Sequence, residues 1–429
     1  MKMTPFWWED APRPSSEQIH LPDSADVAII GAGFTGLCTA LVLARGGASV
    51  VLFESGALGS GASTLNGGMV GPSFHKLGIA GLKKKFGAER ANAILGESIG
   101  FVDFLEIFLA AEGIEADFSR TGRFRGALNQ SHFHTMEREL EMLQEAVGIE
   151  GVMVSKNDQF QETGSPLFHG GVVYHRDGGL HPAKYYNGLV RRVRDEGVRT
   201  ASETAVTGLD KTITGFTVRT SRGDVRVGHV AVCTNGYTGA LTPDLRRRVI
   251  PLRSAMISTE PLDAEVMKAL MPKGRVYGDS RRLVAYYRPS PDGKRILFGG
   301  RGSGLHDNPT ANARALRASM VRVYPQLSEV PISHTWSGLV AYTFDHAPHI
   351  GRLNGGKMGG VFYAMGYCGS GVARSTYFGH KLGQKILGLA DSGTAFDDLE
   401  FETRPLYTGR PWFMPAILAW HRTADRWGL

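Results

Sequence analysis

Short apolar runs alternate with a helical pattern near the start of the chain. The runs Val27 to Ile30 and Val50 to Phe53 flank a helix-like stretch from Leu37 to Arg45. Unbroken apolar runs of this length are typical of strands in a parallel sheet, which is covered by helices on both faces. The pattern therefore predicts a strand, a helix and a second strand in one βαβ unit.

Glycines mark the turn between the first strand and the helix. Gly31, Gly33 and Gly36 spell GxGxxG, and Glu54 follows the second strand. Gly31 permits a tight turn, Gly33 lets a pyrophosphate reach backbone amides at the helix N-terminus, and Gly36 allows close helix packing. Glu54 is placed to accept hydrogen bonds from ribose hydroxyls. The motif predicts an adenine dinucleotide site, and the alternative is a purely structural turn.

Three further glycine-rich segments bear on which dinucleotide is bound. They are Gly61 to Gly68, Ala231 to Gly239 and Gly366 to Val372. A long ligand needs backbone to approach it at several places, and each approach favours glycine because a side chain would intrude. Each segment alone is equally typical of an ordinary loop. Their joint occurrence favours FAD over NAD.

The rest of the chain predicts an interleaved organisation. The expected elements are helices at 100–111 and 136–146, a strand at 171–174, a helix from His181-Pro182, and strands at 254–259, 283–288 and 295–298. We expect an α/β fold in which a Rossmann-like FAD-binding domain (1–95, 170–250 and 325–395) is interleaved with an α+β substrate domain. That domain (96–169 and 251–324) is built on an antiparallel sheet, and residues 396–429 form a tail.

Composition agrees with two packed domains. The chain has 429 residues with 42% apolar content, which is enough for two cores. Cys38, Cys233 and Cys368 are widely spaced and odd in number, so we expect neither a disulfide framework nor a metal site, and a cytoplasmic location. Residues 1–25 lack a signal-peptide pattern, and no window reaches the roughly 18 apolar residues of a spanning helix.

The basic residues that give the net charge of +7 are not concentrated in one segment. Lys83 to Lys85 and Arg246 to Arg248 are short basic runs, and such runs are usually solvated. Nucleic-acid binding calls for a basic stripe with aromatic partners, which is not found. We expect no nucleic-acid partner.

The motifs extend over nearly the whole chain, which resembles the D-amino-acid-oxidase-like superfamily of FAD oxidoreductases. The matching segments are 26–37, 61–63, 66–68, 177–182, 234–239, 336–338, 343–345, 348–351 and 366–372. Phe6 to Asp10, the Asn66-Gly-Gly68 triplet and Arg410 to Pro415 look most like the gamma-glutamylputrescine oxidoreductase group.

The motif and the resemblance together give a set of expected FAD contacts. They are Gly31, Gly33, Phe34, Thr35, Gly36, Glu54, Ser55, Gly61, Ala62, Ser63, Asn66, Gly67, Gly68, Met69, Val206, Thr234, Asn235, Gly236, Gly338, Gly369, Ser370, Gly371 and Val372.

Departures from the superfamily pattern bear on substrate and cofactor. Trp336-Ser-Gly-Leu339 continues with Val340, where the glycine-oxidase branch has a carboxylate-binding arginine. Val340 and Ala341 precede Tyr342-Thr343, where the sarcosine-oxidase branch carries the flavin on a cysteine, so we expect noncovalent FAD. Leu297 occupies the position of that branch's oxygen-activating lysine. The electron acceptor, O2 or another, is therefore left open.

Another departure lies in the 61–68 segment, which has Ser63-Thr-Leu-Asn66 where the putrescine-linked group commonly has Ser-Gly-Arg-Asn. The loss of that arginine is expected to alter the site above the flavin ring.

The candidate catalytic residues are Arg301, Tyr286, Tyr342 and His75. Tyr287 and Arg288 share a strand with Tyr286 and are further candidates for holding a substrate. Tyrosines at alternating strand positions pack in cores as often as they bind ligands, and a lone histidine is more often structural. Arginine on an inward strand face is rarer, so Arg301 is the main candidate.

The resemblance implies an FAD-dependent enzyme that oxidises the C–N bond of a primary or secondary amine, gamma-glutamylputrescine-like or N-alkyl. The resulting imine hydrolyses to a carbonyl and an amine. The alternatives are an amino-acid or opine oxidase, and a flavoprotein subunit or assembly factor with structural FAD. The expected partner is a small-molecule amine, for a monomer or homo-oligomer.

The apolar tail from Trp412 to Trp420 is expected to pack on protein rather than lie on a membrane, with Pro415 interrupting the run.

Overall fold

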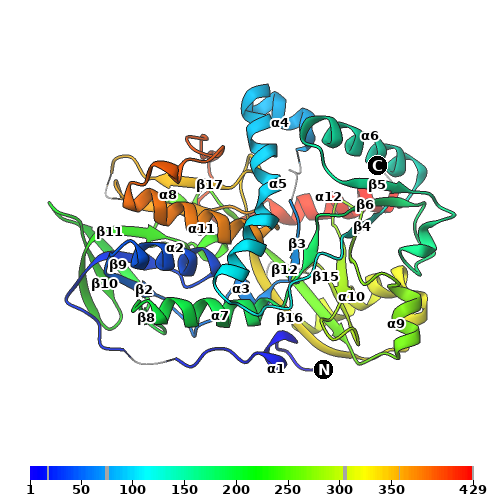
Figure 1. Ribbon diagram of the computed structural model, residues 1–429, viewed down its shortest axis with the longest axis horizontal. Helices are drawn as coiled ribbons and strands as arrows, with labels where there is room; N and C mark the ends of the chain where they lie inside the picture. Colours follow the sequence, from blue (N-terminus) through cyan, green and yellow to red (C-terminus); the bar gives the residue numbers. More distant parts are fainter. Residues whose placement is uncertain (17–18, 73–76, 303–306, 357, 428–429) are drawn as a thin grey trace.

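Two large sheets lie side by side in the molecule. The computed structural model describes residues 1–16, 19–72, 77–302, 307–356 and 358–427. In Figure 1 the first sheet occupies the left half and the second the right half, with the long helix α5 (Ala88–Ala111) upright between them. The site described below lies where these two halves meet.

The first sheet is a parallel sheet with an antiparallel extension. Its eight strands are β1 (Ser24–Ile30), β2 (Val50–Phe53), β8 (Arg199–Ala201), β9 (Val206–Lys211), β10 (Phe216–Thr220), β11 (Gly223–Val232), β17 (His349–Arg352) and β18 (Phe362–Met365). Strands β18, β11, β1, β2 and β8 run parallel to their neighbours. Strands β9 and β10 continue antiparallel from β11, and β17 pairs antiparallel with β18.

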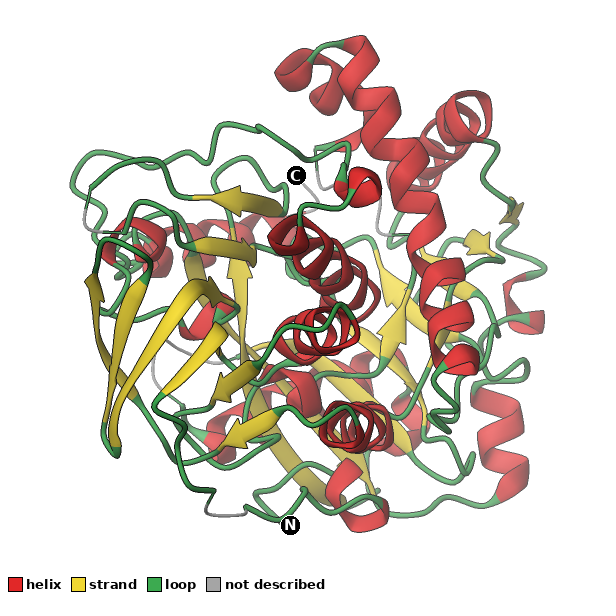
Figure 2. Ribbon diagram, turned by 60° about the vertical axis from the view of Figure 1, so that its left-hand side comes forward, coloured by secondary structure: helices red, strands yellow, loops and turns green. Residues whose placement is uncertain are grey.

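Both faces of β1 are buried, as its unbroken apolar run requires. Val27 and Ile29 pack on a helical layer of α2 (Phe34–Arg45), α7 (Pro182–Asp195) and α11 (Gly371–Leu387). Ala28 and Ile30 pack on the opposite side with residues of β10 and β11. Figure 2 shows the helical layer beside the curved antiparallel strands. Alternating contacts of this kind explain why no polar residue interrupts the buried run from Val27 to Ile30.

The second sheet is almost entirely antiparallel. Its order is β16 (Ile332–Tyr342), β12 (Ile250–Thr259), β15 (Ile296–Arg301), β14 (Tyr286–Pro289), β13 (Val276–Asp279), β4 (Arg123–Gly126), β6 (Gly171–Tyr174) and β5 (Gly151–Val154). The β13–β4 pair alone is parallel within it. Helices α9 (Ala264–Leu270) and α10 (Pro309–Val323) cover one face, over a core containing Tyr277, Tyr287 and Phe298.

The remaining elements join or cover the two sheets. They are α1 (Trp7–Asp10), α3 (Ala62–Leu65), α4 (Gly78–Phe86), α6 (Gln130–Val147), α8 (Pro243–Arg246), α12 (Met414–Trp427) and the short pair β3 (Met69–Val70) and β7 (Gly178–Gly179). Helix α6 begins where the Asn129 side chain accepts a hydrogen bond from the His132 amide and ends at left-handed Gly148.

The expected α/β fold with a second, antiparallel sheet is confirmed, but two strands belong to the other sheet. Strand β6 pairs with β4 and β5, and β16 pairs with β12. Both had been assigned to the FAD-binding domain. A short apolar run specifies burial but not the pairing partner, which is set by contacts distant in sequence. The domain limits otherwise stay a prediction.

Helix α5 also differs from expectation. It starts at Ala88 instead of near Gly100, and Phe101 and Leu105 pack in the same core as Leu37 and Phe378 of the first half. Its sequence is apolar on more than one face because both halves of the molecule pack against this helix.

The tail forms a helix that packs on the second sheet. Met414 and Leu418 are buried with Ile250, Leu252 and Tyr407, so packing of this run on protein is confirmed for these two residues. Trp412 and Trp420 are 67% and 58% exposed. Pro415 lies in the first turn of α12, where its missing N–H removes no helical hydrogen bond.

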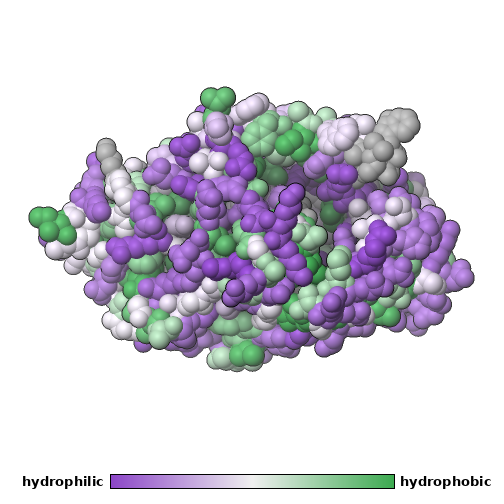
Figure 3. All heavy atoms as spheres, turned by 90° about the horizontal axis from the view of Figure 1, so that it is seen from above, coloured by the Kyte–Doolittle hydropathy of each residue, from purple (hydrophilic) through white to green (hydrophobic). Residues whose placement is uncertain are grey.

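The face of the molecule seen in Figure 3 is predominantly polar. Figure 3 shows hydrophilic side chains over most of one face, with hydrophobic ones in patches between them. Among the described helices, none is both long and apolar enough to cross a membrane.

Candidate functional site

A cavity of about 1170 Å³ runs between the two halves of the molecule. One end lies at the carboxyl ends of β1 and β2, where open parallel sheets bind their ligands. The other end reaches β14, β15 and the polar face of α6. All expected FAD contacts line this cavity except Gly36, Gly68 and Gly236. Their role in binding stays a prediction.

The glycine turn at β1 has the geometry that the motif implied. Gly31 has a φ of +104°, and a Cβ there would lie 3.0 Å from the carbonyl oxygen of Cys233. A Cβ at Gly36 would lie 2.0 Å from the carbonyl oxygen of Gly31. Gly36 therefore lets α2 close on the turn and does not itself face the cavity. Gly33 precedes the first turn of α2 and lines the cavity.

Glu54 lies at the end of β2 and holds the same turn. Its carboxylate accepts hydrogen bonds from the amides of Ala32 and Gly56, both at 3.1 Å, and from the Ser55 hydroxyl at 3.2 Å. The acid fixes the backbone that would surround a ribose and lines the cavity with its own side chain.

Residues 61–68, here called the 61–68 loop, cross the middle of the cavity. The Ser63 hydroxyl accepts from the Phe34 amide at 3.0 Å, which ties the loop to the N-terminus of α2. The Asn66 side chain accepts from the Gly68 amide at 2.7 Å and donates to the carbonyls of Ala62 and Ser63. A Cβ at Gly68 would lie 2.2 Å from the Leu180 carbonyl, so Gly68 faces the protein and not the cavity.

Three indole groups hold the 61–68 loop from outside. Trp7 donates to the Asn66 carbonyl at 2.8 Å, Trp8 to the Thr64 hydroxyl at 3.2 Å, and Trp336 to the Leu65 carbonyl at 3.2 Å. Trp7 and Trp336 are buried. Sequence reasoning used the N-terminal aromatic residues only as a mark of resemblance and missed this contact. Indole N–H groups in apolar surroundings need a partner, which was the available signal.

Arg288 reinforces the loop from the second sheet. Its guanidinium donates to the carbonyls of Gly68 and Leu180, both at 2.9 Å. Burial lowers its pKa to about 10. Because its guanidinium is buried against these two carbonyls, Arg288 does not line the cavity. Its expected role in holding substrate was wrong.

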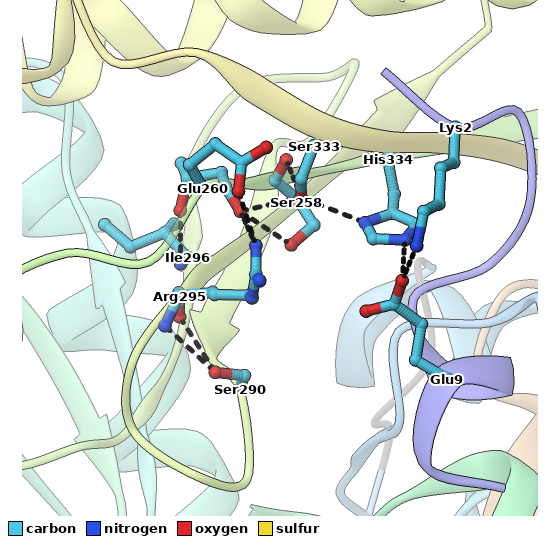
Figure 4. A network of polar contacts seen from close by, with 10 residues as sticks. Lys2, Glu9, Ser258, Glu260, Ser290, Arg295, Ile296, Ser333 and His334 are labelled. Carbon is cyan, nitrogen blue, oxygen red and sulfur yellow. Dashed lines mark hydrogen bonds and ion pairs between the residues drawn. The ribbon is translucent and has the colours of Figure 1, made fainter.

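The N-terminal segment is itself fastened to β16 (Figure 4). The Lys2 amide donates to the Ser333 carbonyl at 2.7 Å, and the Lys2 carbonyl accepts from Thr335 at 2.9 Å. Glu9 pairs with the Lys2 ammonium and lies 3.1 Å from His334 Nε2. The two tryptophans are thus attached to an element of the second sheet, while their indoles hold a loop of the first half.

The far end of the cavity is formed by Tyr286, Tyr342 and Arg301. The Tyr286 hydroxyl lies 2.9 Å from Ser254 Oγ, and burial raises its pKa. Its ring covers Gly299, where a Cβ would lie 2.3 Å away, and reaches 3.3 Å from the Cβ position of Gly67. Tyr286 therefore connects the second sheet with the 61–68 loop.

Arg301 lies beside this tyrosine pair. Its guanidinium carbon lies 5.5 Å from the centre of the Tyr342 ring. Among the residues that the structure describes, no carboxylate pairs with it, and its side chain lines the cavity. A partly buried cation without an acid is an anion-binding group, or a positive charge that acts on whatever lies beside it.

Other candidates are placed elsewhere. Tyr287 faces the opposite side of β14 and stacks between Tyr277 and Phe298 at 5.3 and 5.1 Å, so it is a core residue. Leu297 is buried beside Trp7 and Trp336 and does not line the cavity. His75 lies outside the described residues.

Three non-glycine residues with positive φ line the cavity: Asn235 (44°), His346 (57°) and Cys368 (54°). Strained backbone of this kind persists where surrounding contacts over-determine it. The Asn235 side chain accepts from the Gly366 amide at 2.9 Å, which joins two of the glycine-rich segments. Cys368 is buried and carries a free thiol, whose pKa burial raises. Among the described residues, no cluster of metal ligands occurs.

The comparisons with known proteins cover nearly the whole chain. Residues 26–385 match the family described as FAD dependent oxidoreductase. The chain is 31% identical to the probable oxidoreductase OrdL of Haemophilus influenzae over 90% of its length and 88% of the relative's. It is 29% identical to the gamma-glutamylputrescine oxidoreductase of Escherichia coli over 88% of its length and 87% of that protein's.

A solved structure has the same fold at lower identity. The crystal structure of glycine oxidase from Geobacillus kaustophilus superposes with a TM-score of 0.74 at 18% identity, covering 90% of this chain and 99% of that one.

Proposed function

The chain belongs to the FAD dependent oxidoreductase family, whose members bind FAD, and from this premise we propose that it oxidises the C–N bond of a primary or secondary amine. The observation that carries the proposal is the single cavity that joins the glycine turn of β1 to Tyr286, Tyr342 and Arg301. The relative from Escherichia coli is named for gamma-glutamylputrescine, which supports an amine of that kind or an N-alkyl amine as substrate.

The residues present fit FAD at the near end of the cavity. Gly33 lines the cavity directly before α2, so the backbone there leaves the space that a pyrophosphate needs at the start of the helix. Glu54 lies where the ribose is expected, and the 61–68 loop lies where the chain must approach the flavin ring. When bound, FAD supplies a two-electron acceptor.

The oxidation balances without a further reactant in the first step. The amine loses a hydride from the carbon next to nitrogen, for which bound FAD would be the acceptor, and a proton from nitrogen to solvent, and a C=N bond forms. Water then adds to this bond and releases a carbonyl and an amine or ammonia. The reaction needs the amine in its neutral form, because the nitrogen lone pair must assist hydride loss.

Arg301 favours that neutral form. A fixed positive charge beside an ammonium group lowers the pKa of the ammonium, since like charges disfavour each other at short range. Tyr286 and Tyr342 supply ring surfaces that orient the alkyl chain and exclude water. The role of the described residues is therefore to place, desolvate and neutralise the amine.

A second candidate function is oxidation of an amino acid, and Arg301 is the observation that favours it. A guanidinium that no carboxylate of the described residues pairs with can bind an α-carboxylate in the cavity. This would replace the arginine that is absent at Val340. The two candidate functions use the same bound FAD but predict different substrates.

Anaerobic mixing of the purified holoprotein with two substrate panels tests these functions. Diamines, N-acyl diamines and N-alkyl amines are expected to bleach the flavin absorbance, whereas simple α-amino acids are not. Bleaching by amino acids alone would replace the proposal with the second candidate. Flavin that stays oxidised with both panels would leave a structural role for FAD in a complex. Admitting air to the bleached protein then shows whether O2 reoxidises it.

The cofactor is proposed to be noncovalent, since Val340 and Ala341 precede Tyr342 where an attachment cysteine would lie. Acid precipitation is expected to leave FAD in the supernatant. A yellow pellet would contradict the proposal, with Cys368 as the first residue to examine because its thiol lines the cavity.

A further inference from the structure

The cavity continues past Tyr286 into an arm bounded by one face of α6. Thr135, Arg138, Glu139, Met142 and Leu143 all line it. Their spacing of three and four residues places them on one side of the helix. The polar members lie toward the N-terminal end of α6 and the apolar ones toward the C-terminal end. This face is therefore graded from charged to apolar along the cavity.

The opposite wall of the arm comes from β4 and β6. Arg123 and Arg125 line the cavity, while Phe124 between them points into the core of the second half. Alternation along a strand sends neighbouring residues to opposite faces. Tyr174 of β6 lies opposite Arg123 and also lines the cavity. Strand β4 and helix α6 thus direct three arginines, Arg123, Arg125 and Arg138, into one space.

Two acids at the arm, Asp177 and Asp279, are already paired with arginines. Arg123 Nε lies 2.9 Å from the buried Asp177 carboxylate. Asp279 is buried and accepts from Arg281 at 2.6 Å. These two acids are therefore not available to a ligand, because each is already neutralised by an arginine.

Three charged groups keep hydrogen-bonding capacity. Arg125 contacts Glu139 through one nitrogen and one oxygen at 3.0 Å, and the two side chains are 35% and 39% exposed. Arg138 contacts the Thr135 hydroxyl at 3.5 Å and has no acidic partner among the residues that the structure describes. A guanidinium has five donors and a carboxylate about four acceptor sites, so most of them are left over.

We propose that this arm binds the zwitterionic amino-acid head group of a long amine substrate. The carboxylate of the head group lies against Arg125 and Arg138, and its ammonium lies against Glu139. A lone anion fits less well, because Glu139 would repel it. The substrate class is an amine joined through an amide to an amino acid whose α-amino and α-carboxyl groups are free.

The apolar part of the cavity suits the connecting chain. Ile79, Leu95 and Leu143 line it, and such side chains favour methylene groups over water. The inference rests on the proposed amine oxidation for the orientation of the substrate, with the reacting amine at Tyr286 and Arg301. The head-group site itself can be tested without turnover.

The kinetic test compares two substrates and matched variants. N-(γ-glutamyl)-1,4-diaminobutane carries the zwitterion, and N-butyryl-1,4-diaminobutane lacks it. Arg138→Gln is expected to raise KM for the first by roughly 10- to 100-fold, the scale of a hydrogen bond between charged groups, with kcat within about twofold. KM for the second substrate is expected to stay unchanged.

Glu139→Gln is expected to raise the same KM by a smaller factor. The controls are Glu141→Gln, an exposed acid on the same helix outside the cavity, and Arg322→Gln on α10. Neither control is expected to change KM. Equal effects of Arg138→Gln on both substrates would overturn the inference.

A binding measurement separates this inference from the proposed function. The γ-glutamyl amide of ethylamine has the head group but no terminal amine to oxidise. Calorimetric titration of the holoprotein is expected to show binding that Arg138→Gln weakens by the same factor. Such binding without any amine turnover would leave the head-group site standing and reject amine oxidation. Amine turnover without such binding would reject the head-group site alone.

Discussion

The two ends of the cavity are built in opposite ways. The cofactor end is made largely of backbone and small residues in a few glycine-rich segments, of which the first runs from Gly31 to Glu54. The substrate end is made of long side chains from β4, β14, β15 and α6, which are distant in sequence. A backbone cradle recognises what every FAD presents, whereas projecting side chains change by single substitutions. One scaffold can therefore keep its cofactor while the substrate varies.

The same contrast applies to how each end fails. At the cofactor end an added atom meets backbone, as at Gly36, and backbone cannot move aside cheaply. At the substrate end a removed group leaves solvent-accessible space, as at Arg138. Substitutions are therefore expected to abolish cofactor binding at one end and to alter substrate parameters at the other.

Gly33→Val is expected to have the largest effect. Its side chain would enter the space at the start of α2 and approach Ser63 Oγ, which a Cβ at residue 33 already reaches at 3.1 Å. The purified variant should be folded and colourless. Gly96→Val in α5, where a Cβ would meet nothing within 4 Å, is the control and should stay yellow. A Gly33→Val protein that binds a full complement of FAD would contradict the proposed difference between the two ends of the cavity.

Removing residues 411–429 is expected to weaken the substrate end and spare the cofactor end. Leu418 is buried in a cluster that also includes Leu283 and Tyr342 of the cavity wall. Leu418→Ala should lower the free energy of unfolding by about 2 to 4 kcal/mol, the usual loss for a buried leucine. Truncation should cost at least as much and should raise KM with the FAD affinity unchanged.

Trp420→Ala is the matched control for the tail, because Trp420 is 58% exposed. It should leave the unfolding free energy within about 0.5 kcal/mol of the parent value. A truncated protein of undiminished stability, together with salt-sensitive sedimentation of the full chain on anionic liposomes, would instead favour a membrane role for α12.

Arg301→Gln is expected to lower kcat/KM for amines by roughly 10- to 100-fold, the scale of one interaction with a charged group. The pH at which kcat rises should also move upward, because the bound substrate ammonium loses a neighbouring positive charge. Arg301→Lys keeps the charge and should keep that pH. An unchanged pH profile in Arg301→Gln would show that the guanidinium does not act on the amine.

Glu54→Gln is expected to have an effect of about the same size as Arg301→Gln, but on FAD binding. The amide retains an oxygen for the Ala32 or Gly56 amide but loses the charge, so FAD binding should weaken by about 1 to 3 kcal/mol. Flavin titration of the apoprotein measures this, with Glu150→Gln, an exposed acid, as control. Unchanged affinity would show that another group holds the ribose.

The cofactor end could be predicted because its determinants are local. A turn that needs Gly31, a helix that needs Gly36 and an acid after the next strand lie within one short stretch, and each follows from a steric or hydrogen-bonding demand. The fold class followed from the same stretch and from the resemblance. The binding roles of these residues stay predictions.

The substrate end was only partly predictable. Tyr286 and Arg301 could be proposed from strand alternation, but Arg125, Arg138 and Glu139 could not. Their convergence depends on the pairing of β4 with β6 and on the packing of α6, which are long-range contacts without a local pattern. The pairing of β6 and β16 with strands of the second sheet could not be predicted for the same reason.

The contact between the N-terminal segment and β16 also sets an order in time. Residues 1–11 leave the ribosome long before residues 332–342, to which Lys2 is hydrogen-bonded. At 5 to 20 residues per second the delay is roughly 16 to 65 s. Until then Trp7 and Trp8 have no anchored position, and the 61–68 loop lacks all three of its indole donors, because Trp336 belongs to β16 itself. We therefore expect the nascent chain to acquire FAD only after β16 is complete, which ribosome-bound chains stalled before and after residue 342 would reveal by flavin fluorescence.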